Sequence, residues 1–338
     1  MTLFGIGRRS GDDGGTGGDG HDRALRVFVT GATGYIGRGV VRELADAGHE
    51  VAGLTRWAEQ TLALKRVGAR AVVGDVRDPA TYYRVAAEYD ALVHLAAGGA
   101  TVEEKATTDR AAIDALLHVA GRDVEEREKK GRPPRVVIYT SGCFVLGETR
   151  GEKPADEDSP TDHPPGIVAW RPDHERRILD AARPGIATAI IRPGMVYGGR
   201  GGVIGRFFRT AVEDGRAAYV GDGANRWSPV YRGDVARLYR MVAERAARGI
   251  FHCAEPRAVP VAELARSAAE AAGRDGATRS IPLDRARERM GGLADALVMD
   301  QAMAARRSHA LGWRHEHPPF VESAVDVFRE WEEGEPLA

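Results

Sequence analysis

Residues 30–37 read Thr-Gly-Ala-Thr-Gly-Tyr-Ile-Gly, and they carry the clearest structural signal in the chain. An apolar run of strand length, Arg26–Thr30, leads into it, and an amphipathic run of helical period, Tyr35–Ala47, leads out of it. The segment therefore predicts a buried strand, a tight turn and a helix in immediate succession.

The three glycines of this turn have separate physical uses. Gly31 permits a sharp turn, Gly34 lets the backbone come close to a ligand, and Gly37 allows the helix to pack tightly on the strand. The start of the helix then offers free backbone N–H groups and the positive end of its dipole to a phosphate. We therefore expect the pyrophosphate of a dinucleotide to bind here.

Outward from this unit, strand-length apolar runs alternate with helical stretches, which predicts an α/β fold with a doubly wound (Rossmann) parallel sheet covered on both faces. The expected strands are Arg26–Thr30, Glu50–Leu54, Ala71–Gly74, Ala91–Leu95, Arg135–Thr140 and Ala187–Ile191. The expected helices are Tyr35–Ala47, Ala58–Val67, Ala80–Glu88, Glu103–Ala120 and Arg171–Ala182.

The same pattern predicts the domain organisation. Residues 25–192 form the dinucleotide-binding domain. Residues 193–338, where Gly- and Pro-rich turns separate short elements, form mainly a smaller C-terminal substrate lobe that is interleaved with the sheet. Residues 1–24 are rich in Gly and Asp and cannot bury a core, so we expect a disordered tail.

Bulk composition restricts the class of protein. The apolar fraction of 43% is that of a globular chain, and a net charge of −1 gives no reason to expect nucleic acid or an anionic membrane as a partner. Two isolated cysteines, Cys143 and Cys253, and the lack of a signal or membrane-spanning run favour a cytoplasmic location. His315 and His317 lack a third ligand, so we expect no metal site.

The ends of the second and third strands indicate which dinucleotide binds. Thr55 and Arg56 stand where an acid would bind a ribose 2′-hydroxyl, so they favour the 2′-phosphate of NADP over NAD; a solvated arginine is the alternative. Asp75, followed by Val76, could accept a hydrogen bond from the adenine amine or could simply stabilise a turn.

Several motifs together resemble the extended short-chain dehydrogenase/reductase family, also called the NAD-dependent epimerase/dehydratase family. They are TGATGYIG at 30–37, GDV at 74–76, HLAA at 94–97, VVIYTSGCFVLGE at 136–148, IRPGMVYG at 191–198 and GDGANRWSPVYRGDVARLY at 221–239. The resemblance implies a sheet of about seven strands and a nicotinamide across their carboxyl ends. It also implies backbone contacts from Tyr35 and Ile36, and an adenine-ribose side formed by Ala96 and Ala97.

The chain departs from this family at the proton-transfer site, which usually holds Tyr-x-x-x-Lys on one helix face. Between Tyr139 and Tyr197 there is no tyrosine, and no lysine follows Lys153. Trp170 occupies the tyrosine position and His174 the lysine position. Because an indole does not titrate near neutral pH, Trp170 cannot be the acid.

Four residues are candidates to replace the missing pair. His174 titrates in a suitable range and could donate the proton, with help from Asp173; alternatively His174 is packed and Asp173 only complements the helix dipole. Ser141 lies one residue before the usual hydroxyl position. Tyr197 could point into the cleft or pack in a core.

These observations leave three functional hypotheses. The first is an NAD(P)-dependent oxidoreductase, epimerase or dehydratase that acts on a hydroxyl or carbonyl carbon of a sugar, nucleotide sugar or secondary metabolite. The second is a non-catalytic dinucleotide sensor or scaffold, and the third is a non-redox lyase or cyclase on the same fold. By analogy with the family, the helices at 103–120 and 171–182 could form a homodimer interface.

Overall fold

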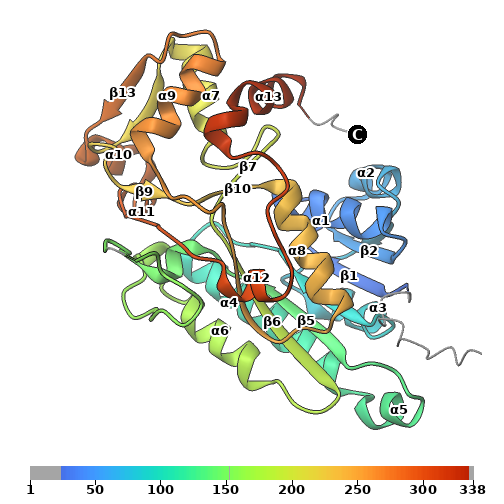
Figure 1. The fold of residues 1–338 in the computed structure, drawn as a ribbon. Helices are drawn as coiled ribbons and strands as arrows, with labels where there is room; N and C mark the ends of the chain where they lie inside the picture. The colour runs from blue at the N-terminus through green and yellow to red at the C-terminus, as the bar shows by residue number, and fades with distance from the viewer. Residues whose placement is uncertain (1–23, 152, 335–338) are drawn as a thin grey trace, which may run out of the picture.

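The computed structural model describes residues 24–151 and 153–334, and its centre is a parallel sheet (Figure 1). Within these residues the sheet has seven strands in the order β11-β6-β5-β4-β1-β2-β3, with parallel pairing throughout. The strands are β1 (Arg26–Thr30), β2 (Glu50–Thr55), β3 (Arg70–Val73), β4 (Ala91–His94), β5 (Arg135–Thr140), β6 (Ile186–Pro193) and β11 (Gly249–Cys253). The doubly wound sheet expected from the sequence is confirmed.

Helices cover both faces of the sheet because the strand side chains alternate between the two sides. Val27 and Val29 of β1 share one core cluster with α1 and α8, whereas Phe28 between them belongs to the cluster that α3, α4 and α6 complete. The bounds are α1 (Tyr35–Asp46), α3 (Tyr83–Ala86), α4 (Val102–Gly121), α6 (Arg171–Asp180) and α8 (Arg232–Glu244). Every residue of β6 is buried, as a central strand covered on both faces requires.

The remaining elements form a lobe above the carboxyl edge of the sheet (Figure 1). Its strands are β7 (Met195–Tyr197), β8 (Ala217–Val220), β9 (Arg226–Trp227), β10 (Pro229–Tyr231), β12 (Val259–Pro260) and β13 (Thr278–Ile281). Its helices are α7 (Gly205–Asp214), α9 (Val261–Ala271), α10 (Leu283–Met290), α11 (Leu293–Leu297) and α13 (Phe320–Glu333). The chain returns to the sheet from this lobe through α8, β11 and α12 (Arg306–Ala310), so the two parts are interleaved.

Two expected helices are shorter than the sequence pattern suggests. The stretch 58–67 forms a 3-10 turn at Ala58–Gln60 followed by α2 (Thr61–Arg66), and the stretch 80–88 retains only α3 after a turn at Pro79–Thr81. A further short helix, α5 (Val124–Lys129), precedes β5. Residues 1–23 of the expected tail lie outside the described residues. No helix in the described ranges is long and apolar enough to cross a bilayer.

Helix α13 is anchored to the lobe by a buried carboxylate. The backbone N–H of Phe320, at the start of α13, donates to Glu255 over 3.2 Å, and Glu255 is only 3% exposed. Burial raises the pKa of Glu255 to about 7. The unfolded chain has an ordinary glutamate with a pKa of about 4.3.

This difference predicts a pH dependence of stability. The folded state holds the Glu255 proton more tightly than the unfolded chain does. The resulting contribution to the free energy of unfolding is therefore complete below about pH 4.3 and is lost as the pH rises through about 7. We expect the free energy of unfolding of the wild type to fall, between about pH 5 and about pH 8, by up to about 3 kcal/mol more than that of Glu255→Gln, whose side chain stays neutral. Urea unfolding at the two pH values measures this difference. Equal pH dependence of the two proteins would contradict this assignment.

Candidate active site

The glycine turn between β1 and α1 is made of backbone contacts that leave no room for side chains. Gly31 has a φ of +72°, and the Gly34 N–H donates to its carbonyl over 2.9 Å. A Cβ at Gly31 would lie 2.6 Å from the Ala96 nitrogen, and one at Gly37 would collide with the Gly31 carbonyl oxygen. Gly34 is the N-cap of α1 and provides no capping side chain, so the first-turn amides are left for a ligand.

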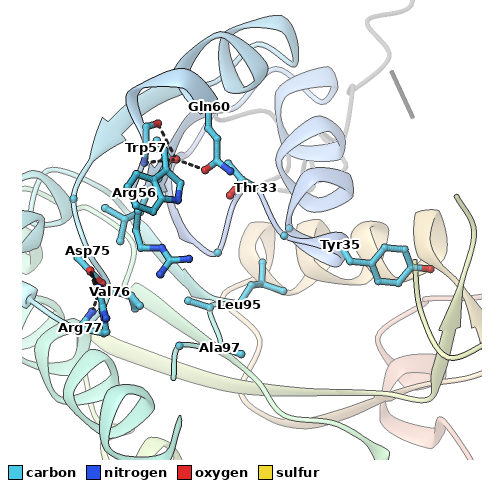
Figure 2. Close-up of a pocket in the computed structure, with 18 of the residues that line it drawn as sticks. Thr33, Tyr35, Arg56, Trp57, Gln60, Asp75, Val76, Arg77, Leu95 and Ala97 are labelled. Atoms are coloured by element: carbon cyan, nitrogen blue, oxygen red, sulfur yellow. Dashed lines mark hydrogen bonds and ion pairs between the residues drawn. The ribbon is translucent and has the colours of Figure 1, made fainter. Parts of the chain in front are cut away.

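A pocket of about 440 Å³ opens at this turn (Figure 2), and we call it the glycine-turn pocket. It runs along the carboxyl ends of β1 to β5, where ligands bind in doubly wound folds. All eleven residues assigned to the dinucleotide from the sequence line it: Gly31, Gly34, Tyr35, Ile36, Gly37, Thr55, Arg56, Asp75, Val76, Ala96 and Ala97. The lining is completed by Thr33, Leu54, Trp57, Gln60, Gly74, Arg77, Leu95, Gly98 and Thr140.

The end of β2 contributes a cation to this pocket. Arg56 points into the pocket in Figure 2, its guanidinium lies 5.7 Å from the centre of the Trp57 ring, and no acid in the described ranges forms an ion pair with it. The Thr55 hydroxyl, by contrast, donates to Gln60 over 2.6 Å and is therefore engaged in the local turn. Arg56 is thus the group at this end that can meet an anion.

Asp75 is tied to its own turn. Its carboxylate accepts hydrogen bonds from the backbone N–H and the guanidinium of Arg77, and these bonds lower the pKa of Asp75. Of the two alternatives left open by the sequence, the structure displays the turn-stabilising one. The side chain nevertheless lines the pocket, so it can still contact a bound base.

The opposite end of the pocket, at Thr140, adjoins two buried polar atoms without partners. Ser141 follows Thr140 and is 8% exposed, and its Oγ has no hydrogen-bond partner. The Trp170 Nε1 is likewise buried and unpaired. Trp170 directly precedes Arg171, whose guanidinium donates to the Thr140 carbonyl over 2.6 Å. Neither side chain lines the pocket itself, but buried polar groups normally have partners, so both atoms are donors still available near this end.

His174 is buried behind this end of the pocket and contacts a carboxylate. Its Nδ1 lies 2.8 Å from Asp109 Oδ2 on α4. The Tyr139 hydroxyl donates to the same oxygen over 2.8 Å, and the Nε2 of His94 lies 3.1 Å from Asp109 Oδ1. His94 in turn lies 2.6 Å from the Thr30 hydroxyl. We call Thr30, His94, Asp109, Tyr139 and His174 the Asp109 cluster.

The other two candidates lie elsewhere. Asp173 is exposed and forms an ion pair with Arg176 over 3.1 Å. Tyr197 is buried in the core of the lobe, where its hydroxyl donates to the Pro318 carbonyl over 3.2 Å, and burial raises the pKa of Tyr197 far above its ordinary value. Burial also raises the pKa of Cys143 to about 12, as expected for an inert packed thiol.

The sequence analysis missed Asp109, His94 and Tyr139. One signal for Asp109 was present: it shares the buried stripe of α4 with Ala112, Ile113 and Leu116, at spacings of three, four and seven residues. An acid on an apolar stripe requires a buried partner, because an unpaired charge is costly there. The sequence alone gave no sign that the partner would be His174.

The comparisons with known proteins agree with this geometry. The model of the NAD dependent epimerase/dehydratase family matches residues 27–254, which include the glycine turn and all seven strands of the sheet. The chain belongs to the NAD-dependent epimerase/dehydratase family. Its cofactor is accordingly a nicotinamide dinucleotide.

Members of this family with similar sequences or folds include characterised and uncharacterised proteins. An uncharacterised protein of Saccharomyces cerevisiae is 31% identical over 298 residues, covering 86% of this chain and 94% of the yeast protein. The 2′-dehydrokanamycin reductase of Streptomyces kanamyceticus is 31% identical over 277 residues, covering 79% of this chain and 72% of the reductase. The human epimerase family protein SDR39U1, solved with NADPH, shares the fold with a TM-score of 0.72 and 20% identity. The match covers 90% of this chain and 99% of the human chain.

The close contact at Gly37 can be tested with two matched substitutions in α1. Gly37→Ala should weaken NADPH binding at least about tenfold and lower stability, since the new methyl group meets the Gly31 backbone. The Cβ of Gly39→Ala makes only ordinary contacts, with the Arg232 side chain at 3.5 Å and the Ala236 Cβ at 3.8 Å, and should raise stability by up to about 1 kcal/mol. Calorimetric titration and thermal unfolding measure both effects; indistinguishable variants would refute the assigned contact.

Proposed function

We propose that this chain is an NADP-dependent oxidoreductase that transfers hydride between the dinucleotide and a carbonyl or hydroxyl carbon of a small molecule. The glycine-turn pocket carries the proposal, because its glycine cradle and its Arg56 cation fit the pyrophosphate and the 2′-phosphate of such a cofactor. When bound, a nicotinamide dinucleotide supplies or accepts the hydride. The protein's residues bind it, orient the substrate and move the proton.

Arg56 supports NADP over NAD. It is a pocket-lining guanidinium without an acidic partner in the described ranges, and a guanidinium binds phosphate through charge-assisted, bidentate hydrogen bonds. No carboxylate follows β2 to bind a ribose 2′-hydroxyl, since the next residues are Arg56 and Trp57. The preference thus depends mainly on Arg56, because the Thr55 hydroxyl is already bonded to Gln60.

Near the Thr140 end of the pocket, we assign substrate binding and proton transfer to different side chains. Ser141 Oγ–H and Trp170 Nε1–H are buried donors that can bind a substrate oxygen, but neither titrates near neutral pH. His174 lies beside Trp170, with ring centres 4.9 Å apart, and an imidazole can both donate and accept a proton. We therefore assign substrate binding to Ser141 and Trp170, and proton transfer to His174.

A ketone without a diphosphate is the substrate class that the lobe supports best. A guanidinium without a partner could bind a diphosphate, but Arg226 of β9 binds Asp300 through two guanidinium nitrogens at 2.9 and 3.2 Å. Asp300 is 3% exposed, so this pair is not readily given up to an anion. The Streptomyces relative is by its name a reductase of a dehydro compound, which is consistent with ketone reduction.

Transfer of deuterium tests the proposed reaction. The protein is incubated with ketones of varied size and with NADPH that carries deuterium at the transferring face of nicotinamide C4, and products are analysed by mass spectrometry. We expect an alcohol with deuterium on the former carbonyl carbon. Binding of NADPH without transfer to any ketone would instead indicate a sensor. Failure to bind either dinucleotide would remove the oxidoreductase proposal altogether.

The cofactor preference is expected to depend on one side chain. Arg56→Ala should weaken NADPH binding by about 10- to 100-fold, the loss of one charge-assisted phosphate contact, and leave NADH binding within about threefold of wild type. Arg66→Ala, an exposed change on α2 outside the pocket, is the matched control. Both affinities come from fluorescence titration, and an equal loss for the two dinucleotides would contradict the role given to Arg56.

A further inference from the structure

The buried carboxylate of Asp109, at the centre of the Asp109 cluster, joins four elements. Asp109 of α4 is 4% exposed and receives contacts from β4, β5 and α6, through His94, Tyr139 and His174. Burial alone would raise the pKa of Asp109, but hydrogen bonds from His174 and His94 oppose it, and the resulting pKa lies well below the ordinary value. Asp109 is therefore an ionised carboxylate, which can only accept hydrogen bonds.

This charge fixes the proton positions of its neighbours. His174 must carry a proton on Nδ1 and His94 a proton on Nε2, because those nitrogens face Asp109. Burial raises the pKa of Tyr139 well above its ordinary value, so its phenol also stays protonated and donates.

The two histidines then differ in what they can do. The second nitrogen of His94 lies 2.6 Å from the Thr30 hydroxyl, which can donate to it, so a neutral His94 is satisfied at both nitrogens. The Nε2 of His174 has no hydrogen-bond partner in the described part of the chain. One imidazole is therefore held on both sides, and the other presents a nitrogen that can exchange a proton.

The cluster lies directly behind the glycine-turn pocket. Thr30, His94 and Tyr139 each precede a residue that lines the pocket, namely Gly31, Leu95 and Thr140. Within β5, neighbouring side chains point to opposite sides, so Thr140 lines the pocket while Tyr139 belongs to the cluster.

Charge explains why an acid is needed here. The Arg171 guanidinium lies 3.3 Å from the Tyr139 hydroxyl, so a protonated His174 would share its surroundings with a second cation. On the β6 side of α6 the cation Arg192 is already neutralised by Glu175. Asp109 is thus the carboxylate that offsets a proton on His174.

We propose that Asp109 is the positioning residue of the proton donor: it turns His174 so that Nε2 faces the substrate, and its charge stabilises the protonated ring. The proposal rests on the oxidoreductase function above. In reduction, the carbonyl carbon gains the hydride as the reduced dinucleotide is oxidised, and the carbonyl oxygen takes the proton from His174 Nε2. His174 is left neutral, with its Nδ1 proton still bound to Asp109, and solvent restores the lost proton.

The tautomer of His174 tests this assignment without any substrate. Imidazole nitrogen chemical shifts of wild type at alkaline pH should show His174 protonated on Nδ1 and not on Nε2, with its signals identified by their loss in His174→Gln. In Asp109→Asn the Nδ1 preference should decrease, because the ionised acceptor is gone. A wild-type His174 protonated on Nε2 would overturn the proposal, whether or not Asp109→Asn folds.

Turnover supplies the second test, with the ketone found by deuterium transfer. Asp109→Asn should lower kcat by about 100-fold while leaving NADPH affinity within about threefold, because the group acts through His174 and not on the cofactor. Asp114→Asn, on the same helix and in exposed pairs with Arg110 and Arg177, should stay within about threefold of wild type.

The outcomes separate the two proposals. A wild-type enzyme that reduces a ketone while Asp109→Asn keeps its kcat refutes the role of Asp109 and leaves the oxidoreductase function standing. A wild-type protein that transfers no deuterium refutes that function, and with it the reaction step assigned to His174.

Discussion

At the glycine turn, backbone segments of the chain touch one another directly, with no side chain between them. Gly31 packs against the Leu95–Ala96 backbone at the end of β4, and Gly37 packs against Gly31 itself. These contacts fix the start of α1 relative to two neighbouring strands. Because no side chain intervenes, the uncapped amides of α1 open into the same space as the ends of β2 to β5, and that shared space is the glycine-turn pocket.

Features encoded in consecutive residues could be predicted from the sequence, and features that depend on distant residues could not. The strands at 26–30 and 135–140 were placed correctly to the residue because their apolar runs are bounded by turn signals. Strand β11 was missed: it is short, contains the polar His252, and owes its place to pairing with β6, about sixty residues earlier. The sheet order follows from such pairings, and only the crossover rule constrained it beforehand.

The candidate site divides in the same way. The residues assigned to the dinucleotide follow strand ends, and counting along the chain was enough to predict that they share one pocket lining. His174 was proposed because it occupies the position where the family usually has its lysine. Its partner Asp109 lies 65 residues away in the sequence and looks like an ordinary acid of a helix. The sequence pattern could not show whether Tyr197 faces the cleft or a core. Side chains along a strand alternate between its two faces, but the alternation does not reveal which face borders the cleft. In the structure that side chain belongs to the lobe core.

Helix α6 shows why the loss of the tyrosine and lysine did not leave an ordinary core helix. Its inward face carries Arg171, His174 and Glu175 beside the apolar Ile178 and the partly buried Leu179. Each polar group has a separate partner: the Thr140 carbonyl, Asp109 and Arg192. Burying charges in this way contributes little net stability compared with apolar packing, because desolvation offsets the attraction. What these contacts do provide is a fixed rotation of the helix, since three anchors on three neighbouring elements cannot be satisfied at any other angle. A helix held for packing alone would use leucines at these positions, so the polar face favours a helix kept for the orientation of His174.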